Sequence, residues 1–319
     1  MKTIGYHYIR KFDPSFPFQD GIRFLDIDSF RKQLDLLQKE HTFPTREEFL
    51  GYVRHQEPLP ENSLVLSFDD GTRDHYEYVF PELLSRDLWG IFFIPVRHIV
   101  HGLPNFTFVL HHLIGRVGVN SILLHALDYI ESKLSGQEEF DIEAYNKAYA
   151  ETRQADHAAQ IVALKRLINS KLFFRTERSK DGLMQDMIRE FFPDFNLSSI
   201  YMTNEQLRIL QQNGMLLGGH SVTHNYMRDL SSEEQRNEIG TTFEILDTIT
   251  GGLPARIFAY PYGGLDTINL NTFEALQENA VDSAFTFEAS QEDQSPEHQK
   301  YRQYLWPRIS CSKFQLSLS

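Results

Sequence analysis

Residues 63–71 read Ser-Leu-Val-Leu-Ser-Phe-Asp-Asp-Gly, and this stretch decides the fold class. Its first part is a nearly continuous apolar run rich in Leu and Val, which is typical of a parallel strand covered on both faces. Two carboxylates follow at the carboxyl end of that strand, where parallel α/β barrels place their active sites. We therefore predict a buried strand over Ser63–Phe68 that delivers Asp69 and Asp70 to the functional edge of a sheet.

Short apolar runs alternate with longer amphipathic runs on both sides of this stretch. Further strands are expected over Thr3–Ile9, Trp89–Val96, Met215–Gly219, Arg256–Tyr260, Ser283–Phe287 and Leu305–Ser310. Helices are expected over Asp28–Lys39 with Asp28 as its N-cap, over Thr72–Leu88 with a kink or break at Pro81, and over Asn204–Asn213, Ser231–Thr250 and Thr267–Asn279. This alternation indicates an α/β fold and suits a barrel of about seven parallel strands.

Residues 97–202 interrupt this rhythm. Helical spacing of apolar residues appears there over Ser121–Leu134, Ala144–Leu172 and Asp181–Phe192. We expect a catalytic barrel made of residues 1–96 and 203–319, and a helical insertion made of residues 97–202. The insertion is either a packed decoration or a lid or subunit interface over the active site. Four of its histidines are expected to have surface or packing roles: His98, His101, His111 and His112.

The bulk composition excludes several classes of protein. The chain has 319 residues, of which 41% are hydrophobic and 24% charged, and its formal net charge is −13. An acidic surface argues against non-specific binding to nucleic acid or to anionic membranes. Because we find neither a secretory signal nor a run of about 18 apolar residues, we expect no membrane-spanning segment and a cytoplasmic location. Cys311 is the single cysteine, so no intramolecular disulfide is possible.

Two motifs at predicted strand ends carry chemistry. Adjacent carboxylates at Asp69 and Asp70 favour a bound cation, although Asp-Asp-Gly is also common in turns. His220 and His224 lie four residues apart after the strand Met215–Gly219, and present two imidazoles to one side if the segment turns helically. One carboxylate and two imidazoles would leave open positions on a metal, as in catalytic sites. Asp69 then remains available as a general base.

A third motif is Phe-Ala-Tyr-Pro-Tyr-Gly-Gly at residues 258–264, which also ends a predicted strand. A backbone N–H near Tyr262 could stabilise an oxyanion, and the aromatic rings could line a sugar pocket. An ordinary strand exit rich in turn-forming residues explains the same pattern.

Taken in this order, Ser-Phe-Asp-Asp-Gly (67–71), His-Ser-Val-Thr-His (220–224) and Tyr-Pro-Tyr-Gly (260–263) resemble the polysaccharide deacetylase family, the NodB-homology or family-four carbohydrate esterases. The resemblance covers about residues 1–96 and 203–310 and leaves the insertion unexplained. It implies a deformed (β/α) barrel that removes acetyl groups from N-acetylated sugars or saccharides. It also implies Asp69 as base, Tyr262 as oxyanion donor through its backbone, and Asp70, His220 and His224 as metal ligands. The implied metal is divalent, in first place zinc, with cobalt, nickel or iron as alternatives.

Two departures from the family pattern bear on the catalytic groups. The third motif often begins with an arginine that orients the base, and this chain has Ala259 there. The last motif often supplies a histidine as general acid, whereas residues 305–309 read Leu-Trp-Pro-Arg-Ile. Arg308 cannot readily release a proton, but it could hold Asp69 in place or bind a substrate anion. His7, on the first predicted strand, is a candidate acid or substrate contact; the alternative is a buried histidine satisfied by the backbone.

Two other functions remain open at this point. One is a non-catalytic sugar-binding protein on the same fold, which the missing arginine and histidine favour. The other is a two-histidine, one-carboxylate iron oxygenase, which shares the ligand set but leaves Asp69 unexplained. Whichever of these functions is correct, the helical insertion could also join copies of the chain into a homo-oligomer.

Overall fold

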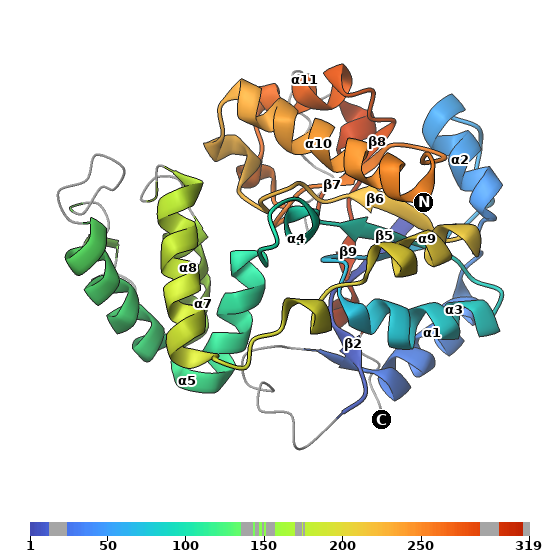
Figure 1. The fold of residues 1–319 in the computed structure, drawn as a ribbon. Coiled ribbons are helices and arrows are strands. Elements are labelled where there is room, and N and C mark those ends of the chain that lie inside the picture. Colours follow the sequence, from blue (N-terminus) through green and yellow to red (C-terminus); the bar gives the residue numbers. More distant parts are fainter. Residues whose placement is uncertain are drawn as a thin grey trace.

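The computed structural model of the protein describes residues 1–12, 24–134, 143, 147, 148, 150, 157–169, 174, 176–287 and 300–314. Seven strands form one sheet in the order β8-β7-β6-β5-β4-β1-β9, and every adjacent pair is parallel (Figure 1). Their bounds are β1 Lys2–Tyr6, β4 Leu64–Phe68, β5 Gly90–Ile94, β6 Leu216–Gly219, β7 Ile257–Ala259, β8 Ser283–Phe285 and β9 Ile309–Ser310. The predicted α/β barrel of parallel strands is confirmed.

The segment Trp306–Ser310 connects the two edges of this sheet. At one end Trp306 forms a bridge with Phe285 of β8, and at the other end β9 pairs with β1. The predicted strand Leu305–Ser310 is shortened to Ile309–Ser310 in the structure. Pro307 has no N–H to donate to a strand ladder, which limits the pairing before Ile309. This closure carries Arg308 into the barrel, where it is fully buried.

Helices on the outside of the barrel separate the strands. All five residues of β4 and all five of β5 are buried, as expected of strands covered on both faces. The helices are α1 Ile27–Glu40, α2 Arg46–His55, α3 Phe80–Ser85, α9 Asn204–Gln212, α10 Ser232–Thr250 and α11 Leu270–Glu278. A π-helical turn, His75–Val79, precedes α3, and Pro81 lies in the first turn of α3. The predicted helix is thus divided next to this proline by a change from π to α hydrogen bonding, while Val79 and Phe80 keep helical φ and ψ.

Two predictions near the N-terminus are wrong in detail. The first strand ends at Tyr6, which pairs with Phe68, the last residue of β4, so no partner strand remains beyond it. Ile9–Arg10 instead forms a separate strand, β2, that pairs with β3, Leu25–Asp26. The N-cap of α1 is Asp26, whose carboxylate accepts the N–H of Asp28 at 2.9 Å, so Asp28 lies in the first turn.

The helical insertion forms a lobe beside the barrel with an apolar core of its own (Figure 1). It contains α4 Arg97–Val100, α5 Phe106–Tyr129 with a π-helical extension Ile130–Leu134, α7 His157–Asn169 and α8 Glu177–Phe191. The first long helix thus begins at Phe106 rather than at Ser121, and part of the predicted helix Ala144–Leu172 lies outside the described residues. The boundaries 97 and 202 stay a prediction.

The helix that spans Phe106–Leu134 is long and apolar enough to cross a membrane by length and composition alone. Half of its most apolar window is buried inside the protein, and Gly118 interrupts the helical backbone with a φ of 77°. It packs against α7 and α8, so the pattern is explained by a core helix of the insertion.

Candidate active site

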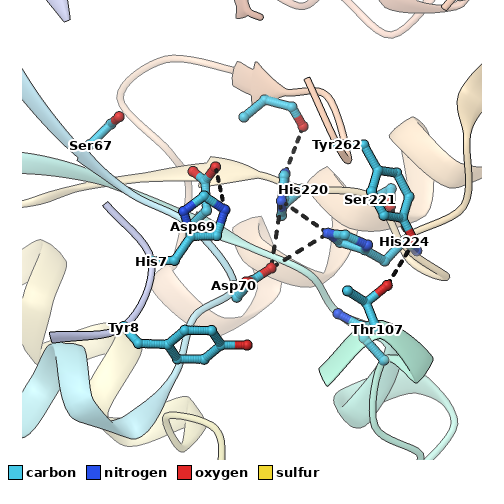
Figure 2. Close-up of polar contacts among 12 residues, drawn as sticks. His7, Tyr8, Ser67, Asp69, Asp70, Thr107, His220, Ser221, His224 and Tyr262 are labelled. Carbon is cyan, nitrogen blue, oxygen red and sulfur yellow. Dashed lines mark hydrogen bonds and ion pairs between the residues drawn. The ribbon is translucent and has the colours of Figure 1, made fainter. Parts of the chain in front are cut away.

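The ends of β4 and β6 bring the predicted metal ligands together. Asp70 follows β4, whereas His220 and His224 follow β6, and one ligand atom from each residue lies within 4.8 Å of the other two. The two Nε2 atoms are 3.3 Å apart, and Asp70 Oδ1 lies 3.8 Å from His220 Nε2 and 3.4 Å from His224 Nε2. Figure 2 shows all three groups directed at one point.

A loop rather than a helical turn presents the two histidines, which corrects the sequence-based expectation. Ser221 has a φ of 63° and His224 a φ of 57°, both in the left-handed region. The Ser221 hydroxyl accepts the His224 N–H at 3.0 Å and closes the loop. The glycines before it allow close packing, because a Cβ at Gly218 would lie 2.6 Å from the Phe93 ring.

The donor set fits a catalytic divalent metal. Ligand atoms about 2.0–2.1 Å from a tetrahedral zinc lie about 3.3–3.4 Å from each other, and the separations of His224 Nε2 from its two partners, 3.3 and 3.4 Å, match this. Two imidazoles and one carboxylate suit zinc, cobalt, nickel or iron. Three protein ligands leave positions for water and substrate.

His220 is held in the form that binds metal. Its Nδ1–H donates to the carbonyl oxygen of Ala259 at 2.8 Å, which leaves the Nε2 lone pair directed at the site. Burial lowers the pKa of this imidazole to about 4, so it is neutral near pH 7. Burial by itself would raise the pKa of Asp70, but the hydrogen bond and charge of His224 hold that pKa well below its ordinary value.

Arg308 holds Asp69 in a buried bidentate ion pair. The guanidinium donates to Oδ1 at 2.5 Å and to Oδ2 at 2.8 Å, and both residues are at most 2% exposed. The Phe93 and Phe287 rings each lie 5.0 Å from the guanidinium carbon. Burial opposes ionisation of Asp69, yet the charge of Arg308, followed by His220 and His7, holds its pKa below the ordinary value. Asp69 is therefore an ionised carboxylate of fixed orientation.

His7 lies beside this carboxylate, just beyond the end of β1. Its Nε2 is 3.9 Å from Asp69 Oδ2, and 41% of its side chain is exposed (Figure 2). The ring also contacts Phe287 edge to face at 5.2 Å. The sequence left two interpretations of His7 open. Its exposed side chain excludes the fully buried histidine, and the ring lines the wall of the pocket.

The pocket over these groups has a volume of about 170 Å³ and is lined by both parts of the chain. Tyr260 and Tyr262 line it from the exit of β7, as the third motif suggested. Thr107, His111 and Lys165 line it from the insertion. The Thr107 and Tyr262 hydroxyls are hydrogen-bonded at 2.7 Å, which joins α5 to the barrel (Figure 2). The insertion therefore forms one wall of the pocket.

Comparison with known proteins finds one family that matches part of the chain. The sequence profile of the family described as polysaccharide deacetylase matches residues 173–282, which contain His220, His224 and Tyr262. This part of the chain, about a third of it, is similar to polysaccharide deacetylases. No curated protein sequence shows significant similarity to it.

Solved structures of deacetylases share the fold of this chain. PplD, a deacetylase of Streptococcus pyogenes in complex with acetate, superposes with a TM-score of 0.55 at 15% identity, over 97% of this chain and 91% of that chain. IcaB of Ammonifex degensii gives 0.51 at 15% identity, over 97% and 91%. The BpsB deacetylase domain of Bordetella bronchiseptica gives 0.52 at 13% identity, over 97% and 95%.

Sequence reasoning missed the pocket residues of the insertion. His111 was expected to have a surface or packing role, but it lines the pocket, whereas His112 packs on Phe108 and Phe192 as expected. No local signal in the sequence separates the two histidines. Arg308, in contrast, makes one of the two contacts considered for it, because its guanidinium holds the Asp69 carboxylate.

Proposed function

We propose that this protein hydrolyses the acetyl amide, or a similar acyl group, of an N-acylated sugar or saccharide with a bound divalent metal, zinc in first place. One observation carries the proposal. An ionised carboxylate, Asp69, fixed by Arg308, stands next to an Asp70–His220–His224 ligand set in one pocket. This combination provides the base and the metal ligands that amide hydrolysis by activated water requires.

The residues around the ligand set divide the chemistry among them. When bound, the metal lowers the pKa of a coordinated water and polarises the acyl carbonyl. Asp69 accepts a proton from the attacking water, and the Arg308 fork keeps the carboxylate aimed at it. The backbone N–H of Tyr262 donates to the oxygen that gains negative charge as the new C–O bond forms.

His7 is the proposed acid. Breaking the C–N bond requires a proton on the departing sugar nitrogen, and His7 faces the pocket beside Asp69 from an exposed position. Imidazole exchanges protons readily near neutral pH, which the Arg308 guanidinium does not. His7 thereby takes the role that the family often gives to a histidine near the chain end.

The insertion is proposed to act as the lid considered from the sequence. A pocket of about 170 Å³ is smaller than the roughly 300–1,000 Å³ typical of sites for drug-sized ligands. Such a pocket encloses an acyl group and part of one sugar unit. The cytoplasmic location and a homo-oligomer built through the insertion stay predictions.

Acetate release from N-acetylated and O-acetylated sugars, including nucleotide-linked ones, tests the proposed function. Purified protein is assayed with zinc or cobalt and compared with Asp69→Asn. We expect release from at least one N-acetylated sugar, and a decrease in kcat of about 10²–10⁴-fold in the variant. Glu77→Gln, a matched loss of one exposed carboxylate, should retain full activity. Turnover that is unaffected by Asp69→Asn would refute the assigned base.

The other two functions lack a supporting observation. A sugar-binding module requires no oriented, ionised base, and an iron oxygenase leaves the Asp69–Arg308 pair unexplained. Sugar binding without acetate release in zinc-loaded protein would favour the first, and oxygen consumption that requires ferrous iron would favour the second.

A further inference from the structure

The second metal-facing histidine lacks the support that the first one has. His220 donates its Nδ1–H to a carbonyl, whereas the Nδ1 of His224 is buried and has no hydrogen-bond partner among the described residues. Histidine ligands usually have their second ring nitrogen fixed by an acceptor. The orientation of His224 therefore depends on its edge-to-face contact with the Tyr262 ring and on the backbone of its loop, which adopts a left-handed conformation at His224 itself.

One side of that loop is held by the barrel helix α10. The Glu238 carboxylate accepts the Val222 N–H at 2.7 Å and the Thr223 N–H at 2.8 Å through Oε2. Its Oε1 accepts the Thr223 hydroxyl at 2.7 Å. These three bonds fix the middle of the loop but do not reach the residue that follows His224.

That residue, Asn225, is held by α8 of the insertion. Its Nδ2 donates to Glu177 Oε1 at 2.5 Å and to the Thr223 hydroxyl at 2.9 Å, and its Oδ1 accepts from the Lys180 ammonium. Asn225 is 2% exposed and Lys180 is 3% exposed. The side chain next to His224 is thus bonded on both its oxygen and its nitrogen.

The same contact continues into α4. Arg97, 2% exposed, donates to Glu177 Oε2 at 3.1 Å and to Asp181. Arg97 is therefore paired with two carboxylates of α8, and the charge of Lys180 is influenced by the same two groups. Such buried charges contribute little net stability compared with apolar packing. The network is therefore better explained by its effect on the positions of the side chains that it joins.

We propose that helix α8 is a positioning element for the metal site, in which Lys180 and Glu177 hold Asn225 and thereby orient His224. This inference rests on the ligand set in the proposed function but not on the reaction. It gives the insertion a second role besides forming the pocket wall. A purely structural role, in which the network only attaches the insertion to the barrel, predicts no effect on metal affinity.

Zinc affinity of the Lys180→Met variant separates the two roles. Competition of the metal-free protein with a chromophoric chelator gives the dissociation constant without any substrate. We expect it to increase by about 10- to 100-fold, the range typical of lost outer-shell support. Arg189→Met removes a cation from the exposed end of the same helix and should bind zinc like wild type. A folded Lys180→Met protein with wild-type zinc affinity would overturn the proposal.

Hydrogen exchange on the wild-type protein gives a second test that needs no variant. Coupling between two sites is reciprocal, so zinc must stabilise α8 if α8 favours zinc binding. We expect slower exchange of Glu177–Phe191 amides on zinc addition, with no change in α2, which lies elsewhere on the barrel. Protection confined to residues 216–225 would overturn the proposal even if Lys180→Met does not fold. Zinc coupling to α8 without acetate release would instead refute the function and leave this inference standing.

Discussion

Arg308 and Asp69 are buried together. The charge of each side chain offsets the free-energy cost of burying the other. Removing one partner of a buried ion pair leaves the remaining charge without compensation, which costs about 3–5 kcal/mol. The pair is bidentate and nearly inaccessible to water, so solvent cannot replace the lost bonds. A change at this pair is therefore expected to affect both stability and the function proposed for Asp69.

A double-mutant cycle should show this dependence. Arg308→Met is expected to lower the free energy of unfolding by about 3–5 kcal/mol, whereas Arg308→Met combined with Asp69→Asn should lose less than the sum of the two single changes. Urea unfolding of the metal-free protein measures all four states. Arg31→Met, which breaks an exposed pair with Glu82, should cost less than about 1 kcal/mol. Strict additivity within the cycle would contradict the pairing.

Individual residues differ in how far the sequence predicts them. Asp70, His220 and His224 follow strands whose carboxyl ends must meet in a parallel barrel, so their convergence could be predicted. For Arg308 the sequence predicted two possible roles, holding Asp69 in place or binding a substrate anion, but it could not decide between them. The 239 residues that separate the two side chains make their contact a result of barrel closure.

At the scale of elements, helix α5 forms part of the pocket wall, and none of the motifs at the strand ends predicts this contribution. The Tyr8 hydroxyl lies 3.2 Å from His111 Nδ1, and His111 Nε2 is buried without a partner among the described residues. With Nδ1 accepting from Tyr8, Nε2 carries the proton and can donate to a ligand in the pocket.

His111→Ala should therefore weaken substrate binding more than it slows the reaction. Loss of one hydrogen bond of about 1.4 kcal/mol raises KM by about tenfold, and we expect kcat to change by less than about threefold. His125→Ala makes the same change on the same helix, where His125 pairs with Asp186 away from the pocket, and should leave both constants unaltered. Initial rates over a range of substrate concentrations give the answer; a large drop in kcat with constant KM would assign His111 to the chemistry instead.

The bounds of helices were predicted closely where local capping residues set them. The ends of strands were predicted less well, because neighbouring strands set them. Helices α9 and α10 begin and end within a few residues of their predicted bounds, because Thr203 and Ser231 form capping boxes with residues three positions on. Helix α2, which Thr45 caps in the same way, was not predicted. Strand ends are less certain, because β1 stops where its partner β4 stops, and β9 shrinks where Pro307 removes a donor.

At the scale of the whole molecule, several histidines are buried in neutral form. Burial lowers the pKa of His75, His98 and His112 from 6.5 to about 4 in each case. Between these two values the unfolded chain binds protons that the folded chain does not, so stability is complete above pH 6.5 and falls as the pH decreases toward 4.

His98→Phe should reduce this acid sensitivity. The ring stacks on Tyr201 at 4.2 Å, and phenylalanine preserves that contact but does not titrate. We expect the difference in unfolding free energy between pH 7 and pH 5 to shrink by about 2 kcal/mol. Urea unfolding at the two pH values measures it, with His55→Phe at an exposed helix end as control. An unchanged difference would show that His98 is protonated in the folded state.

The sequence by itself determined the parallel barrel and the three motifs at its strand ends, because a periodic pattern and a strand end are local features with a fixed place in such a fold. Only the tertiary structure decided that Arg308 reaches Asp69, that His111 faces the pocket, and that α8 holds the loop of His224. Each of these depends on contacts between segments distant along the chain, which barrel closure and helix packing set and which no local pattern encodes.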